Sequence, residues 1–201
     1  SSAVLRVVRG CLREGRVLGV WAGFPCTTWS IARKPALRSA AHLRWVAQML
    51  LSDRTKYQIS IGNATLDATM KIAATCLQEQ VAMMQENPAT SIAWQVDEMH
   101  KVACCRAAHF VIVDLCQFGA KFRKRTGLLL LNGVFVRPLE KTCSGKHGWC
   151  SRSGQRHASL VGGADTRPLQ VYPHGFCEAA AKALMYNAAG NLLGTMHWLS
   201  C

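Results

Sequence analysis

Acidic residues and long hydrophobic runs are both scarce in this chain. Only 11 of its 201 residues are Asp or Glu, and charged residues of both signs together make up 17% of the sequence. No run approaches the roughly eighteen consecutive apolar residues that a membrane-spanning helix requires, so we expect no membrane partner. The N-terminal segment carries several arginines and lacks the apolar centre of a secretory signal. Internal repeats and low-complexity segments are also absent from the sequence.

Cysteine, by contrast, is abundant, but the ten cysteines show no regular framework of disulfide spacings. Several of them lie in apolar stretches that we expect to be helices or strands, which is typical of small buried thiols. We therefore expect an intracellular protein of a reducing compartment, either the nucleus or the cytoplasm. With 50% hydrophobic residues, a chain of 201 residues can bury a sizeable core without disulfide staples.

The positive charge is concentrated in two stretches. Residues 27–57 hold six basic residues and one acidic residue, and residues 115–157 hold nine and one, which accounts for the whole net charge of +13. Concentrated positive charge favours a polyanionic partner. We expect DNA, with RNA as the alternative. Phosphate contacts are assigned to six basic side chains: Arg33, Lys34, Lys121, Lys124, Arg152 and Arg156.

Hydrophobic periodicity predicts strands that alternate with helices, which indicates an α/β fold with a mostly parallel sheet. Gly62-Asn63 is expected to break the chain between two helices. Apolar runs typical of buried strands occur at residues 17–23, 81–85, 109–114 and 127–131. Helical patterns cover residues 1–14, 35–51, 64–80, 92–107 and 176–187. We expect three segments: an α/β core (1–138), a loop-rich insertion (139–171) and a C-terminal helical segment that returns to the core (172–201).

Three polar clusters lie at the expected ends of strands, where sites gather in open α/β sheets. The first surrounds Cys26, whose thiol is either activated by nearby positive charge or structural in a turn. The second contains Glu86, which is either a general acid or base or a solvated neighbour of a helix cap. The third is the basic segment 121–126, which either holds a phosphate or a base edge or forms a solvated turn.

In this order, the three clusters resemble the motifs of DNA cytosine-5 methyltransferases. Gly-Phe-Pro-Cys at residues 23–26, followed by Ser30, resembles the nucleophile motif, and Glu-Asn-Pro at residues 86–88 resembles the Glu-Asn-Val motif. Phe-Gly at residues 118–119, the Arg-x-Arg pair at 123–125 and the strand that follows are similar to a third motif. The set is also similar to methyltransferase-like segments of retroelement-type reading frames. The resemblance implies a partial Rossmann-like methyltransferase sheet with a loop-rich, Cys- and His-containing insertion.

The resemblance also implies a chemistry and a role for each motif. Cys26 would add as a thiolate to carbon 6 of a cytosine flipped out of the duplex, and Glu86 would protonate ring nitrogen 3. The methyl group would then come from S-adenosylmethionine. Arg123 would lie near the base, and Arg125 would support it or bind phosphate. Asn87 would organise the loop.

The chain departs from the family pattern at Thr27, Trp29 and Pro88, and no glycine-rich cofactor loop precedes residue 17. Residues that would bind S-adenosylmethionine are therefore not assigned. Either the cofactor half is missing or methyl transfer has been lost, which would make this methyltransferase-like protein incomplete or inactive. The alternative is a non-catalytic basic module that binds nucleic acid and derives from a methyltransferase fold.

The loop-rich segment 139–171 contains a pattern of cysteines and histidines. Two thiolates and two imidazoles can close a tetrahedral zinc site, which would staple a segment of low apolar content. The alternative is an exposed target-recognition loop, on which Arg152 and Arg156 touch phosphates and Trp149 stacks on a base. The predicted zinc ligands are Cys143, His147, Cys150 and His157.

Overall fold

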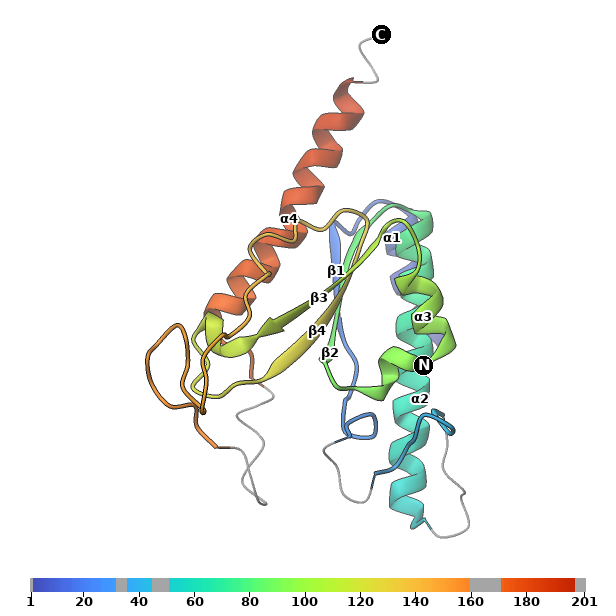
Figure 1. Cartoon of the computed structure of the whole chain (residues 1–201). Coiled ribbons are helices and arrows are strands. Elements are labelled where there is room, and N and C mark those ends of the chain that lie inside the picture. The colour runs from blue at the N-terminus through green and yellow to red at the C-terminus, as the bar shows by residue number, and fades with distance from the viewer. Residues whose placement is uncertain (1, 32–35, 45–50, 160–170, 198–201) are drawn as a thin grey trace.

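Figure 1 shows the computed structural model, which describes residues 2–31, 36–44, 51–159 and 171–197. These residues form a mixed α/β fold, in which four α-helices and two short 3₁₀ helices accompany a four-stranded sheet. In chain order the elements are α1 (Ser2–Arg13), β1 (Gly19–Gly23), α2 (Asp53–Gln78), β2 (Ala82–Pro88), η2 (Ile92–Gln95), α3 (Asp97–Ala103), β3 (Ala108–Asp114), η3 (Leu115–Phe118), β4 (Arg125–Leu131) and α4 (His174–His197).

The strand order is β1-β2-β4-β3, and only β1 and β2 run parallel to each other. Strand β4 is antiparallel to both of its neighbours. The expectation of a mostly parallel sheet therefore holds for this one pair alone. The reason lies in the connection at residues 115–124, because parallel neighbours need a crossover of about a dozen residues or more, usually with a helix, whereas a short turn joins antiparallel strands.

Side chains of the sheet alternate between two hydrophobic layers. Leu129 and Leu131 belong to the layer that packs with α1, α2 and α3. Leu128 and Leu130 belong to the opposite layer, which packs against α4 through Phe176. Successive side chains of a strand point to opposite faces, so the unbroken leucine run of β4 serves both layers. Figure 1 shows this arrangement, with α4 on one side of the sheet and the α-helices α1, α2 and α3 on the opposite side.

Helix α2 continues without interruption through Gly62 and Asn63, so the predicted break at this position is wrong. A β-carbon at Gly62 would lie only 2.5 Å from Thr28 Oγ1, which belongs to the loop after β1. Asn63 Oδ1 accepts a hydrogen bond of 2.7 Å from Arg38 Nη1. Both residues therefore serve tertiary contacts. The glycine costs the helix about 1 kcal/mol relative to alanine, but it lets the loop approach closely.

Two other predicted helices differ from the structure. Residues 36–44 are not helical, and the rest of the predicted helix 35–51 lies outside the described residues except for Leu51, which is also non-helical. The predicted helix 92–107 is divided into η2 and α3, because Val96 between them is extended, with φ −69° and ψ 135°. Residues 132–159 belong to no helix and to none of the four strands of the sheet. None of the described helices is long and apolar enough to cross a lipid bilayer.

Candidate functional site

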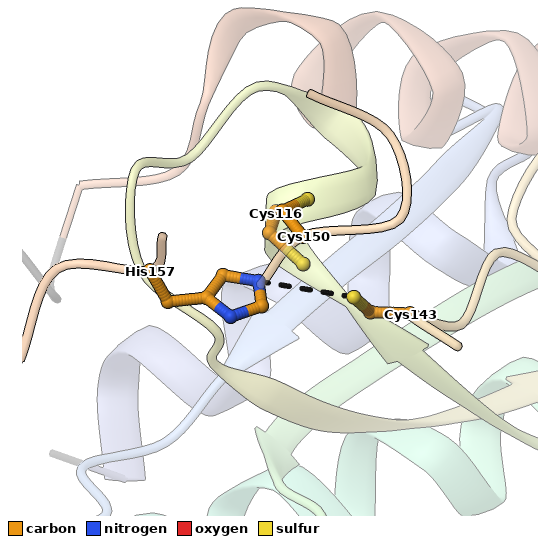
Figure 2. Close-up of side chains that lie close together, drawn as sticks. All are labelled: Cys116, Cys143, Cys150 and His157. Carbon is orange, nitrogen blue, oxygen red and sulfur yellow. Dashed lines mark hydrogen bonds between the residues drawn. The ribbon is translucent and has the colours of Figure 1, made fainter. Parts of the chain in front are cut away.

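Three cysteines and one histidine come together beside the end of β3. Cys116 lies in η3, and Cys143, Cys150 and His157 lie in the segment after β4, which we call the metal loop (residues 141–157). Their Sγ and imidazole nitrogen atoms all lie within 4.8 Å of one another. Figure 2 shows the four side chains pointing toward a common centre, with His157 Nε2 3.8 Å from Cys143 Sγ. The group could hold a metal ion.

One distance in this cluster is close to that expected for tetrahedral coordination. With Zn–S bonds of about 2.3 Å and Zn–N bonds of about 2.0–2.1 Å, the sulfur–sulfur edges of a tetrahedron measure about 3.8 Å and its sulfur–nitrogen edges about 3.6 Å. The observed Cys143–His157 distance of 3.8 Å is close to the second value. All three cysteines are buried and His157 is partly buried. A closed set of four protein ligands is typical of a structural site.

Hydrogen-bond donors around the sulfurs favour thiolates. Burial raises the pKa of Cys143, but the backbone N–H and hydroxyl of Ser151 and the N–H of Gly145 outweigh it and bring the pKa down to about 6. Burial likewise raises the pKa of Cys150, while donors from residues 152 and 153 and from His157 bring it down to about 7. Metal ligation requires deprotonated sulfur, and these donors favour the deprotonated form of two of the ligands, Cys143 and Cys150.

Cys116 differs electrostatically from the other two cysteines. Burial, together with the neighbouring sulfurs, raises its pKa to about 12. Without a metal its thiol stays protonated at neutral pH. A bound metal ion would lower the pKa of this thiol through its positive charge, and Cys116 would then lose its proton on coordination.

The path of the metal loop depends on close backbone contacts. A β-carbon at Gly145 would overlap the carbonyl of Trp149, so only glycine fits there. The N–H of Cys150 donates to the carbonyl of Gln155 (2.8 Å), and the N–H of His157 donates to the carbonyl of Gly148 (2.7 Å). These bonds fold residues 148–157 into a tight turn that returns His157 to the two loop cysteines.

The predicted set of metal ligands is partly different from the observed cluster. His147 lies outside the cluster; it is exposed, with φ +53°, and points into solvent at the turn. Its place is taken by Cys116, which is one of the cysteines in apolar stretches that we expected from the sequence to be small buried thiols. The signal that was missed is the position of Cys116 directly after a strand end, where a side chain can reach a neighbouring loop.

Arg123 and Arg125 both bind Asp114 at the end of β3. Arg125 donates from Nε and Nη2, and Arg123 from Nη2, each at 3.2 Å. Asp114 is fully buried, and its Oδ2 also accepts a 2.7 Å bond from the N–H of Cys143. Burial raises the pKa of Asp114, but these donors outweigh it and hold the pKa below its usual value. The two arginines therefore brace the metal loop, to which Arg123 also donates at the Cys143 carbonyl (2.8 Å).

A second site lies at the carboxyl ends of the parallel strands β1 and β2. Glu86 in β2 is paired in register with Gly23, and Cys26 follows three residues after that glycine. Glu86 is 5% exposed; its Oε2 accepts a 2.6 Å hydrogen bond from Tyr172 Oη, and its Oε1 lies 3.4 Å from Lys124 Nζ. Glu86 Oε1 accepts no hydrogen bond from any described residue. The thiol and the carboxylate therefore share one edge of the sheet, with a cation beside the carboxylate.

The cation at this second site is Lys124 and not one of the arginines. Side chains alternate along an extended segment, so Lys124 points away from the side on which Arg123 and Arg125 bind Asp114. Its side chain is 17% exposed and its ammonium group also lies 5.2 Å from the ring centre of Tyr172. The phosphate contact assigned to Lys124 is thus replaced in the structure by a buried ion pair with Glu86.

The charges at the second site act on Cys26. Burial raises the pKa of this thiol, Lys124 lowers it, and Glu86 raises it further, so the net shift is upward. The pKa of Tyr172 is also raised, by burial first and then by the charge on Glu86 and the hydrogen bond to it. Cys26 in the free protein is therefore a protonated thiol at neutral pH. It is partly buried and not enclosed in hydrocarbon.

Buried polar contacts hold the loop that carries Cys26. Asn87 Nδ2 donates to the carbonyl of Phe24 (3.0 Å), which is the role predicted for this asparagine. The N–H groups of Trp29 and Ser30 both donate to the Cys26 carbonyl at 2.9 Å. The guanidinium of Arg38 stacks on the ring of Trp29 at 3.5 Å, and burial lowers the pKa of Arg38 to about 10.

The remaining basic residues predicted to bind phosphate lie in different places. Lys121, Arg152 and Arg156 are exposed on the side of the molecule that carries the metal loop. Arg33 and Lys34 lie outside the described residues.

No cofactor-binding loop accompanies these two sites in the described part of the chain. In the methyltransferases that the motifs resemble, S-adenosylmethionine is held by a glycine-rich loop that follows a strand. None of the four described strands is followed by such a loop. The described residues therefore do not fit this cofactor.

Comparison with known proteins adds no relative. No family model matches the chain, and no curated protein and no solved structure is significantly similar to it.

Proposed function

We propose that this chain is a nucleic-acid-directed protein of the cytosine-5 methyltransferase-like type, in which Cys26 and Glu86 receive a flipped cytosine. One observation carries this proposal: a cysteine and a buried glutamate lie at the same ends of two adjacent parallel strands, where they interact electrostatically. The resemblance of the surrounding motifs supports it.

The proposed step is a reversible addition to the pyrimidine ring. The Cys26 thiol proton passes to Glu86, which delivers it to ring nitrogen 3 as the sulfur forms a bond with carbon 6. Carbon 5 then takes up a proton from water, and ring nitrogen 3 gives its proton to the hydroxide that remains, so that the adduct is neutral. Reversal removes one of the two hydrogens on carbon 5 and releases the sulfur. Each turnover therefore exchanges the hydrogen on carbon 5 with water, without net change in the base.

The proposed step involves no methyl transfer, because the described residues do not fit S-adenosylmethionine. Tyr172 has a positioning role in the proposal, because its hydroxyl fixes Glu86 Oε2 at 2.6 Å. Lys124 balances the carboxylate charge.

The proposal is tested by release of tritium from an oligonucleotide that carries [5-³H]cytosine. Wild-type protein is expected to release tritium to water, and Cys26→Ser should abolish the release because serine is a far weaker nucleophile. Cys177→Ser is the matched control, since Cys177 is an exposed cysteine on α4. Equal release by Cys26→Ser and wild type would refute the assignment, and so would no release by the wild-type protein.

We further propose that the metal loop binds zinc. Three thiolates and one imidazole are ligands that select zinc over magnesium or calcium. The purified protein is expected to contain one zinc ion per chain by atomic emission, and Cys116→Ser should lower that content as strongly as Cys143→Ser. His147→Ala should leave it unchanged. A zinc content well below one in the wild-type protein would remove the proposal.

A non-catalytic nucleic-acid-binding module is the second candidate. It is favoured by the upward pKa shift of Cys26, because a thiol that stays protonated is a poor nucleophile. This candidate predicts salt-sensitive binding to DNA that is unaffected by Cys26→Ser. Binding of DNA by the wild-type protein without release of tritium would support this second candidate and refute the catalytic one.

A further inference from the structure

A cavity of about 330 Å³ lies beside the metal loop and belongs to neither site described above. It is formed between η3, the metal loop with the preceding Pro138, and the first turns of α4. Its volume is at the lower end of the range of about 300–1,000 Å³ that is typical of ligand sites. Figure 1 shows why these parts meet, since the metal loop lies next to the N-terminal end of α4.

The cavity carries an excess of positive charge. Lys141 and Arg152 come from the metal loop, and Lys182 comes from α4. All three side chains are exposed, and among the described residues no ion pair joins any of them to a carboxylate. Glu178 supplies the cavity's negative charge, and its Oε2 lies 3.9 Å from His174 Nδ1 on the same helix. The lining therefore keeps a net charge of two positive units.

Packing around Phe118 fixes the walls of the cavity. The ammonium group of Lys141 lies 5.2 Å from the ring centre of Phe118. On the opposite wall, α4 approaches so closely that a β-carbon at Gly175 would lie 2.9 Å from the Phe118 carbonyl oxygen. Lys141 and the first turn of α4 are thus held against the same residue.

The metal cluster holds the third cation in place. Gln117 Nε2 donates to Ser151 Oγ (3.2 Å) and contacts the sulfurs of Cys116 (3.7 Å) and Cys150 (3.8 Å). Arg152 directly follows Ser151, so its backbone is tied to η3 through that serine. A metal ion shared by these two cysteines would fix the position of Arg152 relative to the other two cations.

We propose that this cavity binds one phosphate group of a nucleic-acid backbone, held by Lys141, Arg152 and Lys182. Arginine offers a planar fork that matches two phosphate oxygens, and the two lysines add point charges. The chemistry required is that of a phosphodiester or a free phosphate anion. The identity of the polymer rests on the proposed function, whereas the phosphate site rests on the cavity and its charges.

The test is a titration of a fluorescein-labelled DNA duplex, followed by anisotropy at several salt concentrations. One lost phosphate contact reduces the slope of log K against log salt by about 0.9, which corresponds to about eightfold weaker binding at 0.1 M salt. Lys141→Gln/Lys182→Gln is expected to show this loss. The matched control is Lys71→Gln/Lys101→Gln, which removes two exposed charges from α2 and α3 on the other side of the sheet. Glu178→Gln should tighten binding.

A second probe separates this proposal from the proposed function. Calorimetry with pyrophosphate should detect binding by the wild-type protein and the control variant, but not by Lys141→Gln/Lys182→Gln. If pyrophosphate binds to the wild type and the control but not to Lys141→Gln/Lys182→Gln, and the duplex does not bind at all, the result supports a phosphate site and refutes nucleic acid as its partner. Equal losses in both double variants would overturn the site, because they would indicate a diffuse charge effect. Wild-type protein that binds neither probe would also overturn it.

Discussion

Asp114→Asn is expected to destabilise the protein and weaken the metal site together. The carboxylate is fully buried and accepts bonds from Arg123, Arg125 and the N–H of Cys143. Removing one partner of a buried ion pair costs about 3–5 kcal/mol. The two arginine side chains are 35% and 48% exposed, so water can replace part of the lost interaction. We therefore expect a loss of about 2–3 kcal/mol in the free energy of unfolding.

The measurement is urea unfolding at fixed zinc concentration, with zinc affinity measured in parallel. Asp67→Asn is the matched control, because Asp67 pairs with Arg44 at 2.7 Å but its side chain is 46% exposed. This control should lose less than about 1 kcal/mol. A change below about 0.5 kcal/mol for Asp114→Asn would refute the account of Asp114 as the anchor of the metal loop.

The same carboxylate predicts a pH dependence. Its pKa in the folded protein is held below the unfolded value, which is about 3.9. The folded state is therefore stabilised by the charged form above that unfolded value, and the stabilisation is lost as the pH falls through the folded pKa. The stability difference between wild type and Asp114→Asn should shrink below about pH 4. A difference that stays constant down to pH 2 would contradict the assignment.

Three further outcomes are expected. Gly62→Ala should destabilise the protein by about 1–2 kcal/mol in urea unfolding, because its β-carbon meets Thr28 Oγ1 at 2.5 Å and the gain in helix propensity is smaller; an increase in stability would contradict this contact. Gly145→Ala should reduce zinc content, because its β-carbon overlaps the Trp149 carbonyl, and unchanged zinc content would exclude that constraint. Zinc affinity should fall as the pH is lowered, because protons compete with the metal for the three cysteine sulfurs, and an affinity that does not change between about pH 8 and about pH 5 would contradict ligation by thiolates.

The strands were predictable from sequence because their apolar runs are short and bounded by clear turns. All four predicted strands are present, and their observed ends differ from the predicted ones by at most three residues, at the end of β2 (Ala82–Pro88 against the predicted 81–85). Their mutual direction was not predictable, since it depends on which connections are short. Gly62 shows a second limit, because a glycine that permits a close tertiary approach has the same sequence signal as a glycine that ends a helix.

The candidate sites were predictable to the extent that their residues are close in sequence. Cys143, Cys150 and His157 follow one another within one loop and were identified. Cys116 was missed, because β4 separates it from the metal loop along the chain and only the fold brings them together. The ion pair between Lys124 and Glu86 was missed for the same reason.

The alternation of residues 123–125 has a consequence for the evolution of this chain. Substituting one of these residues affects one site, since the two arginines support the metal loop and the lysine supports the thiol site. Inserting or deleting one residue between Arg125 and the rest of β4 would exchange their directions, because the side-chain period of an extended segment is two. A length change at this point would therefore damage both sites at once, whereas a substitution damages only one.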